Sequence, residues 1–311
     1  MMFLSRLSGK SGAFQDNFDS FCKAVQMGIR PAKDSKGFVF LCGANQDIGV
    51  PSARRKALID FANKNLPFCQ FFLAEPIFDE LKAIGNSTQN LLDLEHNISE
   101  FADAIVIVLE SPSAFCELGA FATSRSLREK IIVVNDSRFV TAQSFINHGP
   151  LAAIKDKSGQ KNVIHYRMSE ENDPRKADGI ASIFSRISKV VPKATKAKAV
   201  VASSSLSPTG LTKDALRFVQ DLIVIFGPIT HGEVIQLSST IFGKGHFDNA
   251  KHLTALLRAC DLVAVHSSDS NRFYIPKTHD LNFHYPLDVN ALRASVRALY
   301  WRRDNRRLVN V

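Results

Sequence analysis

The apolar positions of the N-terminal part of the chain are gathered in short runs, most of which show no alternation of apolar and polar residues. Five such runs stand out: residues 38–43, 69–74, 104–110, 131–136 and 162–167. Uninterrupted apolar runs of this length are typical of strands that are covered on both faces, as in a parallel sheet. The pattern therefore predicts a mostly parallel sheet of five strands.

Segments in which apolar residues recur at helical spacing separate these runs. They are residues 52–64, 90–102 and 114–130, and a further one, 176–190, follows the last run. Alternation of strand and helix predicts a doubly wound α/β fold, in which ligands bind at the carboxyl ends of the strands.

The texture of the sequence changes after residue 192. Residues 193–208 are rich in Lys, Ala, Ser and Pro without an apolar period, which predicts a linker. Further on, the chain has helical patterns followed by two β-prone runs around a polar tip, at residues 212–226, 230–239, 249–259 and 262–277. Three helices and a hairpin are typical of a winged helix-turn-helix. We therefore expect an α/β domain over 1–192, a linker over 193–208, and a small winged-helix domain over 209–311 that ends in a basic helix.

Composition narrows the class of protein. With 311 residues, of which 45% are hydrophobic, the chain can bury one large core and one small one. Its formal net charge of +9 favours polyanionic partners. The five cysteines are scattered, and no run of about 18 apolar residues offers a membrane span. A cytoplasmic protein without a disulfide framework, a signal peptide or a membrane segment is expected.

The segment with the clearest chemistry joins the third apolar run to the helical pattern after it. The run ends in Glu110, turns through Ser111 and Pro112, and opens a helix whose first turn is expected to hold Glu117. The positive end of the helix would favour the ionised form of Glu117, as a nucleophile that attacks a ribosyl carbon requires. The alternative is an ordinary acidic residue that complements the helix dipole.

A second carboxylate, Glu95, lies on the apolar stripe of the helix before that run, at the end expected beside the ligand edge. Partial burial should raise its pKa, so that it could protonate a departing base or hydrogen-bond to ribose. A purely structural carboxylate is the alternative.

Small and polar residues at the ends of the other strands complete the expected pocket. Candidate substrate-binding residues are Gly43, Ala44, Asn45, Glu75, Glu110, Ser111, Ser113, Asp136 and Asn147. The first three are predicted to form a turn into a helix, with backbone N–H groups free for a phosphate or sugar. Arg54 and Arg55, just beyond, could clamp a phosphate, or they could be exposed helix arginines without a specific role. No histidine pair has metal-ligand spacing, so we expect no metal and no other cofactor.

Several of these segments together resemble a known family. The run E-S-P-x-x-F-x-E-L-G-A-F, with F-L-C-G, E-P-I-F-D-E-L and S-F-I-N-H-G-P, resembles the nucleoside-deoxyribosyltransferase-like effectors of bacterial retrons, over about residues 38–151. The resemblance implies that Glu117 is the catalytic carboxylate. It also implies a toxic defence protein that cleaves the base–ribose bond of NAD or of nucleotides. Deoxyribosyltransferases usually have Gly-Thr where this chain has Ser113 and Ala114, which leaves the substrate open.

The resemblance also implies partners. A retron reverse transcriptase and its multicopy single-stranded DNA–RNA hybrid would hold the protein inactive. Two other functions stay open, namely a true deoxyribosyltransferase and a non-catalytic nucleotide sensor joined to a DNA-binding regulator. The oligomeric state is open too, with a homo-oligomer among the options.

Basic residues of the C-terminal part are candidates for binding nucleic acid. The third helix offers Lys251, His252 and Arg258, and the hairpin offers Arg272. The Arg-rich last segment adds Arg302, Arg303 and Arg306. Phosphate contacts dominate the affinity of such surfaces, although a protein-binding module or a solvated charged face would have a similar composition.

Overall fold

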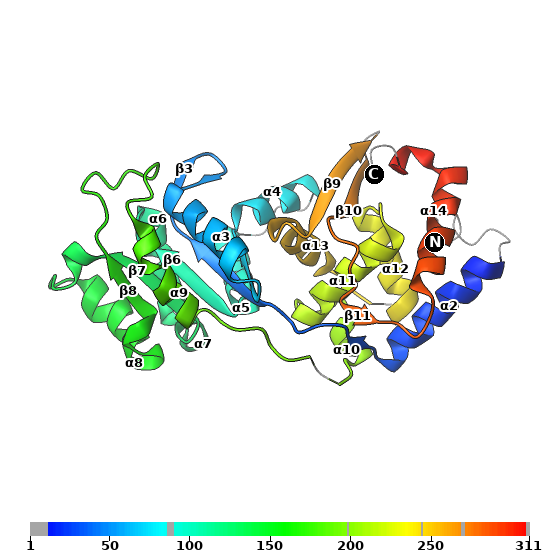
Figure 1. The fold of residues 1–311 in the computed structure, drawn as a ribbon, viewed down its shortest axis with the longest axis horizontal. Coiled ribbons are helices and arrows are strands. Elements are labelled where there is room, and N and C mark those ends of the chain that lie inside the picture. Colours follow the sequence, from blue (N-terminus) through cyan, green and yellow to red (C-terminus); the bar gives the residue numbers. More distant parts are fainter. Residues whose placement is uncertain (1–11, 86–89, 198, 244, 269–270, 309–311) are drawn as a thin grey trace. The chain divides into compact units, whose positions relative to one another are not determined.

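The computed structural model describes residues 12–85, 90–197, 199–243, 245–268 and 271–308 (Figure 1). The chain forms two compact units. The first, which we call the sheet unit, consists of residues 35–76 and 87–195. The second, the helical unit, consists of the described parts of residues 1–34, 77–86 and 196–311. This division differs from the expected domains, because two segments from the N-terminal half belong to the helical unit.

The sheet unit is built on five parallel strands, as the apolar runs predicted. The strands are β2 (Gly37–Cys42), β5 (Cys69–Phe72), β6 (Ala104–Val108), β7 (Ile131–Asp136) and β8 (Val163–Tyr166). Their order across the sheet is β5-β2-β6-β7-β8. Every residue of β2, β6 and β7 is buried, which is why these runs show no alternation.

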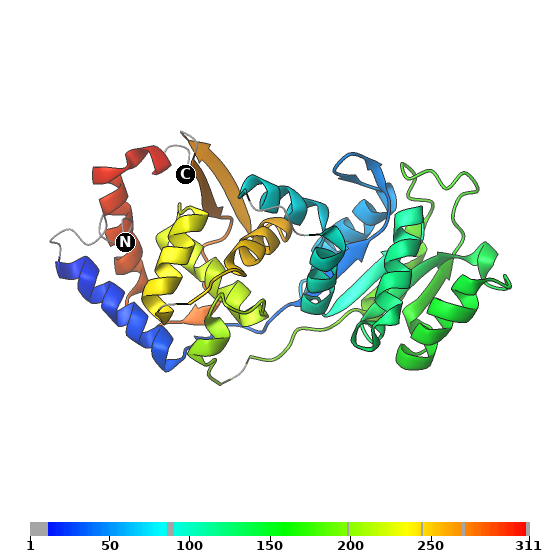
Figure 2. The same cartoon turned by 180° about the vertical axis from the view of Figure 1, so that it is seen from behind.

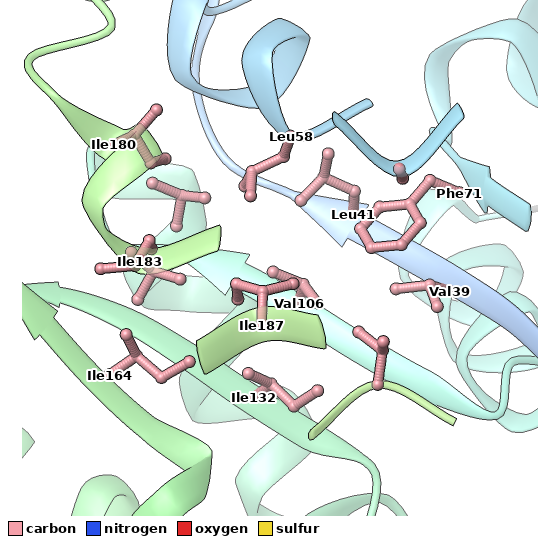
Figure 3. Packing of buried hydrophobic residues seen from close by; sticks show 14 of the residues in the cluster. Val39, Leu41, Leu58, Phe71, Val106, Ile132, Ile164, Ile180, Ile183 and Ile187 are labelled. Atoms are coloured by element: carbon pink, nitrogen blue, oxygen red, sulfur yellow. The ribbon is translucent and has the colours of Figure 1, made fainter. Parts of the chain in front are cut away.

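Helices cover both faces of this sheet, so the expected α/β arrangement is confirmed. On one face lie α3 (Ala53–Asn65), the 3-10 helix η4 (Ile180–Ile183) and α9 (Phe184–Val190), which bury the cluster drawn in Figure 3. On the other lie α5 (Leu91–Phe101) and α6 (Pro112–Thr123), visible from behind in Figure 2. The ring of Phe38 in β2 packs against that of Phe101 in α5, and the ring of Phe40 against that of Phe121 in α6. Shorter helices follow α6, namely α7 (Arg125–Arg128) and α8 (Ala152–Ser158).

Short elements at the carboxyl edge of the sheet were not predicted. A two-stranded hairpin of β3 (Asn45–Asp47) and β4 (Val50–Pro51) separates β2 from α3. Helix α4 (Glu75–Ala83) follows β5. Residues 43–45 therefore do not turn directly into a helix as expected. The hairpin strands are largely exposed and polar, so they leave no apolar pattern in the sequence.

The helical unit contains the predicted order of three helices and a hairpin. The helices are α11 (Lys213–Phe226), α12 (His231–Phe242) and α13 (Ala250–Ala259), and the hairpin consists of β9 (Val263–Ser268) and β10 (Asn271–Pro276). Ile229, just before α12, forms an isolated bridge with Tyr274 of β10. The expected basic helix is α14 (Val289–Arg303), followed by the 3-10 helix η5 (Asn305–Leu308).

An N-terminal helix that the sequence reading did not identify completes the helical unit. Helix α2 (Gly12–Met27) buries Phe18 against Phe226 and Phe21 against Phe218. The chain then forms a short ladder between β1 (Arg30–Pro31) and β11 (Phe283–His284). None of the helices in the described ranges is long and apolar enough to cross a membrane.

The stretch expected to be a linker is partly structured. Thr195 forms a bridge with Ser35 in the sheet unit, and Val201 forms one with Ile29 in the helical unit. Helix α10 (Ser203–Leu206) buries Leu206. A segment without a periodic pattern of apolar residues can therefore still make tertiary contacts.

Candidate active site

Three glutamates from three successive helices meet at the carboxyl edge of the sheet. Glu75 begins α4, while Glu95 and Glu117 lie in α5 and α6. Their charges are coupled, because the charge of Glu75 raises the pKa of Glu95, and the charges of both raise the pKa of Glu117. The structure thus brings together the two expected catalytic carboxylates and one expected substrate-binding residue.

Glu117 is half-buried and differs from expectation in two ways. It is the sixth residue of α6 and lies in the second turn, because the helix already begins at Pro112. Burial raises its pKa to about 7 and the charge of Glu95 adds to this effect, whereas a hydrogen bond with Cys42 opposes it. Desolvation therefore works against the ionised form that the helix dipole was expected to favour. Within the described part of the chain, its Oε2 is buried without a hydrogen-bond partner.

Glu95 has the raised pKa that was expected from partial burial. Burial and then the charge of Glu75 raise its pKa above the ordinary value for a glutamate. A carboxyl group of this kind holds a proton more readily near neutral pH than an exposed one. It can therefore serve as a proton donor or acceptor beside Glu117.

Glu75 is the ionised member of the cluster. Burial alone would raise its pKa, but hydrogen bonds from Arg55 and the charge of Arg55 outweigh burial, and the net pKa is lowered. Nη1 of Arg55 lies 2.8 Å from Oε1 of Glu75, and Nη2 lies 3.1 Å from Oε2. This two-point contact fixes the carboxylate at the start of α4.

Arg55 also ties down the turn after β2. Its guanidinium donates to the backbone oxygens of Leu41 and Ala44 and to Oδ1 of Asn45, at 2.8–3.2 Å. It is 2% exposed, so the alternative of an exposed helix arginine is wrong. Its cost of burial is offset by these acceptors.

Arg54 is fully buried too, and it holds a second cluster beside the first. It donates to Glu110 Oε2 at 2.8 Å, and it also pairs with Asp178 and Asn172. The other oxygen of Glu110 accepts hydrogen bonds from Ser52 Oγ, at 2.6 Å, and from the N–H of Ala44, at 3.0 Å. With both oxygens engaged inside the protein, Glu110 has a structural position rather than one open to a substrate.

The Gly43 turn is shaped by the same contacts. A Cβ at Gly43 would lie 2.8 Å from Glu110 Oε1 and 2.9 Å from Cδ of Arg55, so no larger residue fits. The N–H of Ala44 is bound to Glu110 and is not free for a phosphate as expected. The amide oxygen of Asn45 accepts from Arg55.

The remaining expected pocket residues have local partners. Ser111 caps α6 by accepting from the N–H of Ala114, and its hydroxyl lies 2.9 Å from that of the exposed Ser113. Asp136 pairs with Arg138, and although burial would raise its pKa, those contacts lower it. The amide of Asn147 donates to backbone oxygens of the 139–142 segment. These side chains are therefore engaged with neighbouring residues of the sheet unit.

Cys42, the last residue of β2, is a site residue that the sequence reading missed. Its thiol lies against Glu117, and burial, followed by the charges of Glu117 and Glu95, raises the thiol pKa well above its ordinary value. The thiol therefore stays protonated and can donate to Glu117. A polarisable residue at the final position of an all-apolar strand was the available signal.

Among the candidate nucleic-acid residues whose side chains the structure describes, no observed contact joins one to another. Lys251 and Arg258 lie on α13, half-buried and exposed respectively, whereas His252 of the same helix is 9% exposed. Arg272 is paired with the buried Glu80, which occupies its guanidinium. Arg302 and Arg306 are exposed, and the side chain of Arg303 lies outside the described part of the structure.

Among the described residues, no group of three or more His, Cys, Asp or Glu side chains has an arrangement suited to a metal ion.

The comparison with known families concerns both units. Residues 51–265, more than half of the chain, match the family described as "STM3845 retron effector protein". The chain belongs to this family.

Two relatives of the effector come from Escherichia coli. The protein named "Retron Ec73 putative ribosyltransferase/DNA-binding protein" is 38% identical over 281 residues, covering 88% of the effector and 87% of the relative. The protein named "Retron Ec86 putative ribosyltransferase/DNA-binding protein" is 36% identical over 132 residues, covering 42% of the effector and 41% of the relative. Both names associate the relatives with retrons.

Proposed function

We propose that the effector is a toxic N-glycosidase of the nucleoside-deoxyribosyltransferase-like type that hydrolyses the base–ribose bond of NAD or of nucleotides. The observation on which this depends is the cluster of Glu75, Glu95 and Glu117 at the carboxyl edge of the sheet, where doubly wound folds bind ligands. The word ribosyltransferase in the names of both relatives favours chemistry at a ribosyl carbon.

In the proposed reaction, Glu117 in its ionised form attacks the anomeric carbon of the ribose. The bond from that carbon to the base nitrogen breaks, and its electron pair leaves with the base. Water then hydrolyses the ribosyl ester, with Glu95 accepting the proton of the water. The buried Oε2 of Glu117 without a protein partner is suited to this role, because it has no competing hydrogen bond within the described residues.

The charge of the site favours NAD over neutral-base nucleotides. Three carboxylates face the single guanidinium of Arg55 in this cluster. The nicotinamide ring of NAD is cationic before cleavage and leaves as a neutral molecule, so it needs no strong acid. A bound cation would also lower the pKa of Glu117 and favour its nucleophilic form. Adenine or another neutral base would instead require a proton from Glu95.

A transferase is the second candidate, because the printed names of the relatives say ribosyltransferase. It would pass the sugar from Glu117 to an incoming base instead of to water. Exchange of labelled base without net hydrolysis would identify it. A non-catalytic sensor coupled to a DNA-binding regulator would show neither reaction.

Regulation is proposed to act through the helical unit. Its order of three helices and a hairpin, with the bridge between Ile229 and Tyr274, is typical of a winged helix, and both relatives are named DNA-binding proteins. We propose that this unit holds the effector on the retron reverse transcriptase and its DNA–RNA hybrid in the cytoplasm, where the complex keeps it inactive.

The experiment is release of nicotinamide from NAD by the purified full-length effector, measured beside release of adenine from ATP, AMP and deoxyadenylates. Glu117→Gln should reduce release by several orders of magnitude. Glu129→Gln, which changes an exposed glutamate of the same unit, is the matched control and should retain activity. Free adenine beside an intact NAD pool would overturn the choice of NAD, and full activity of Glu117→Gln would overturn the nucleophile.

A further inference from the structure

One face of α14 combines an exposed aromatic ring with arginines. Arg293, Arg297 and Trp301 are spaced by four residues, which places them in a row along one side of a helix. Trp301 is 71% exposed, and it is the only tryptophan of the chain. The opposite side of α14 is buried through Leu292 and Val296.

The exposure of Trp301 is unusual because burial of its large apolar surface would stabilise the folded protein. A tryptophan buries about 150–250 Å² when it packs inside a protein, and exposed tryptophans are enriched at binding surfaces. The helix does not need Trp301 for its own packing, since Leu292, Val296, Leu299 and Tyr300 already cover the core side.

No acidic side chain within α14 balances the positive charge of the arginines on this face. Helix α14 contains no Asp or Glu between Val289 and Arg303. Arg297 is exposed and forms no hydrogen bond or ion pair with a residue that the structure describes. Burial, and then the charge of Arg297, lower the pKa of Arg293. A polyanion would relieve this repulsion.

Other arginines of the helical unit behave differently. Arg307 is 5% exposed, pairs with Glu233 and Asp304, and lies over the ring of Tyr300. Arg272 pairs with Glu80. Those two are engaged within the protein, so the arginines of α14 are the better candidates for an external anion.

We propose that this face of α14 binds single-stranded nucleic acid, with an unpaired base stacked on Trp301 and a backbone phosphate on Arg297, one turn earlier in the same row. Inside a duplex the bases are already stacked on one another, so an exposed ring gains little there, whereas an unpaired base offers a free face. The inference extends the nucleic-acid part of the proposed function and is independent of the glycosidase reaction.

Two other partners fit the surface less well. A membrane-bound helix inserts a broad apolar face, but the apolar face of α14 is buried within the unit and leaves one exposed ring. An acidic peptide would match the arginines but has no particular use for a tryptophan. Both are tested as competitors below.

The test uses the fluorescence of Trp301, which reports on this position alone because the chain has a single tryptophan. The full-length effector is titrated with single-stranded oligothymidylate of about 15 nucleotides, a length that spans a typical single-strand site. Saturable quenching is expected, with little quenching by a duplex of equal length. Binding detected by anisotropy without any change in emission would overturn the proposal. So would quenching by polyglutamate or anionic vesicles but not by the oligonucleotide.

Variants separate the ring from the charges. Trp301→Ala should weaken single-strand binding about tenfold or more, while Trp301→Phe should retain most of it. Arg297→Gln should reduce the slope of log affinity against log salt by about 0.7, whereas Trp301→Ala should leave that slope unchanged. Met27→Ala, at an 86% exposed position of α2, is the control and should change neither.

Nicotinamide release measured on the same proteins keeps the two proposals apart. If Trp301→Ala binds the oligonucleotide more weakly but releases nicotinamide at an unaltered rate, the result supports the proposed nucleic-acid surface independently of the glycosidase reaction. Equal single-strand affinity of Trp301→Ala and the unaltered effector would overturn the surface, whatever the enzymatic result.

Discussion

At the scale of single residues, the candidate site is defined by how unequally three carboxyl groups hold their protons. Glu75 is kept ionised by Arg55, whereas burial and mutual repulsion raise the pKa of Glu95 and that of Glu117. Pairs of acids whose pKa values are driven apart in this way commonly divide the roles of acid and base. A titration of the site therefore follows the three carboxyl groups together.

The first prediction concerns pH. Glu117 must be ionised to attack, and its pKa is about 7, so kcat/KM should fall about tenfold per pH unit as the pH drops below that value. The measurement is nicotinamide release across roughly pH 5 to 9 under saturating and limiting NAD. A rate independent of pH over the acidic half of that range would contradict Glu117 as the nucleophile.

The second prediction concerns stability. The folded state holds a proton on Glu117 more tightly than the unfolded chain does, so this residue favours folding below its unfolded pKa of about 4.5 and loses that benefit as the pH rises through 7. Glu117→Gln should therefore raise the unfolding free energy above pH 7 by about 2 kcal/mol, with little gain near pH 4. Urea unfolding at both pH values checks this. A gain of equal size at both would point to a cause other than ionisation.

At the scale of elements, the turn after β2 is fixed by hydrogen bonds that involve two arginines of α3. Arg55 binds the backbone of Leu41 and Ala44, and Arg54 binds Glu110 at the end of β6. The strand ends and α3 are thereby joined by charged hydrogen bonds in a buried setting. Such contacts keep the carboxylate cluster in one geometry.

The third prediction follows from the space around Gly43. Gly43→Ala would place a methyl group against Glu110 Oε1 and Arg55, and should destabilise the sheet unit by about 1–3 kcal/mol while lowering activity. Thermal unfolding and nicotinamide release are the measurements. Gly119→Ala in α6, where nothing lies within 4 Å of the added Cβ, is the matched control and should not destabilise. Equal stability of both variants would mean that the turn yields easily.

At the scale of the whole molecule, the chain passes between its two units more than once. Residues 12–34 and 77–86 belong with residues 196–311 in the helical unit, although the sheet unit is formed from the sequence around and between them. The aromatic face of α2 is buried by α11, as in the contact of Phe21 with Phe218. A cut between the units by sequence position alone would separate these partners.

The fourth prediction compares two fragments. Residues 1–195 retain α2 without its partners Phe218, Phe226 and Tyr285, so this fragment should self-associate through the exposed phenylalanines. Residues 35–195 lack α2 and should associate less. Size-exclusion chromatography of the two fragments is the test, and identical elution behaviour relative to their masses would show that α2 needs no cover.

Most of the sheet unit could be predicted, because the spacing of apolar residues that identifies each strand or helix lies within that element. Five short, mostly apolar runs, three of which form fully buried strands, predict a sheet covered on both faces, and the helices between them show their own period. Three helices and a hairpin in the helical unit were found for the same reason. The residue Glu117 could be selected because a carboxylate follows a buried strand in a strand-to-helix turn.

The sequence by itself determined the parallel sheet, the order of its elements and the candidate Glu117, since strand and helix periods depend on neighbouring residues. Only the tertiary structure decided that Arg54 and Arg55 are buried, that Glu110 is occupied, and that Cys42 lies against Glu117. Burial and ionisation depend on what distant segments place around a side chain. The same reason explains why α2 belongs to a unit whose largest segment begins only at residue 196.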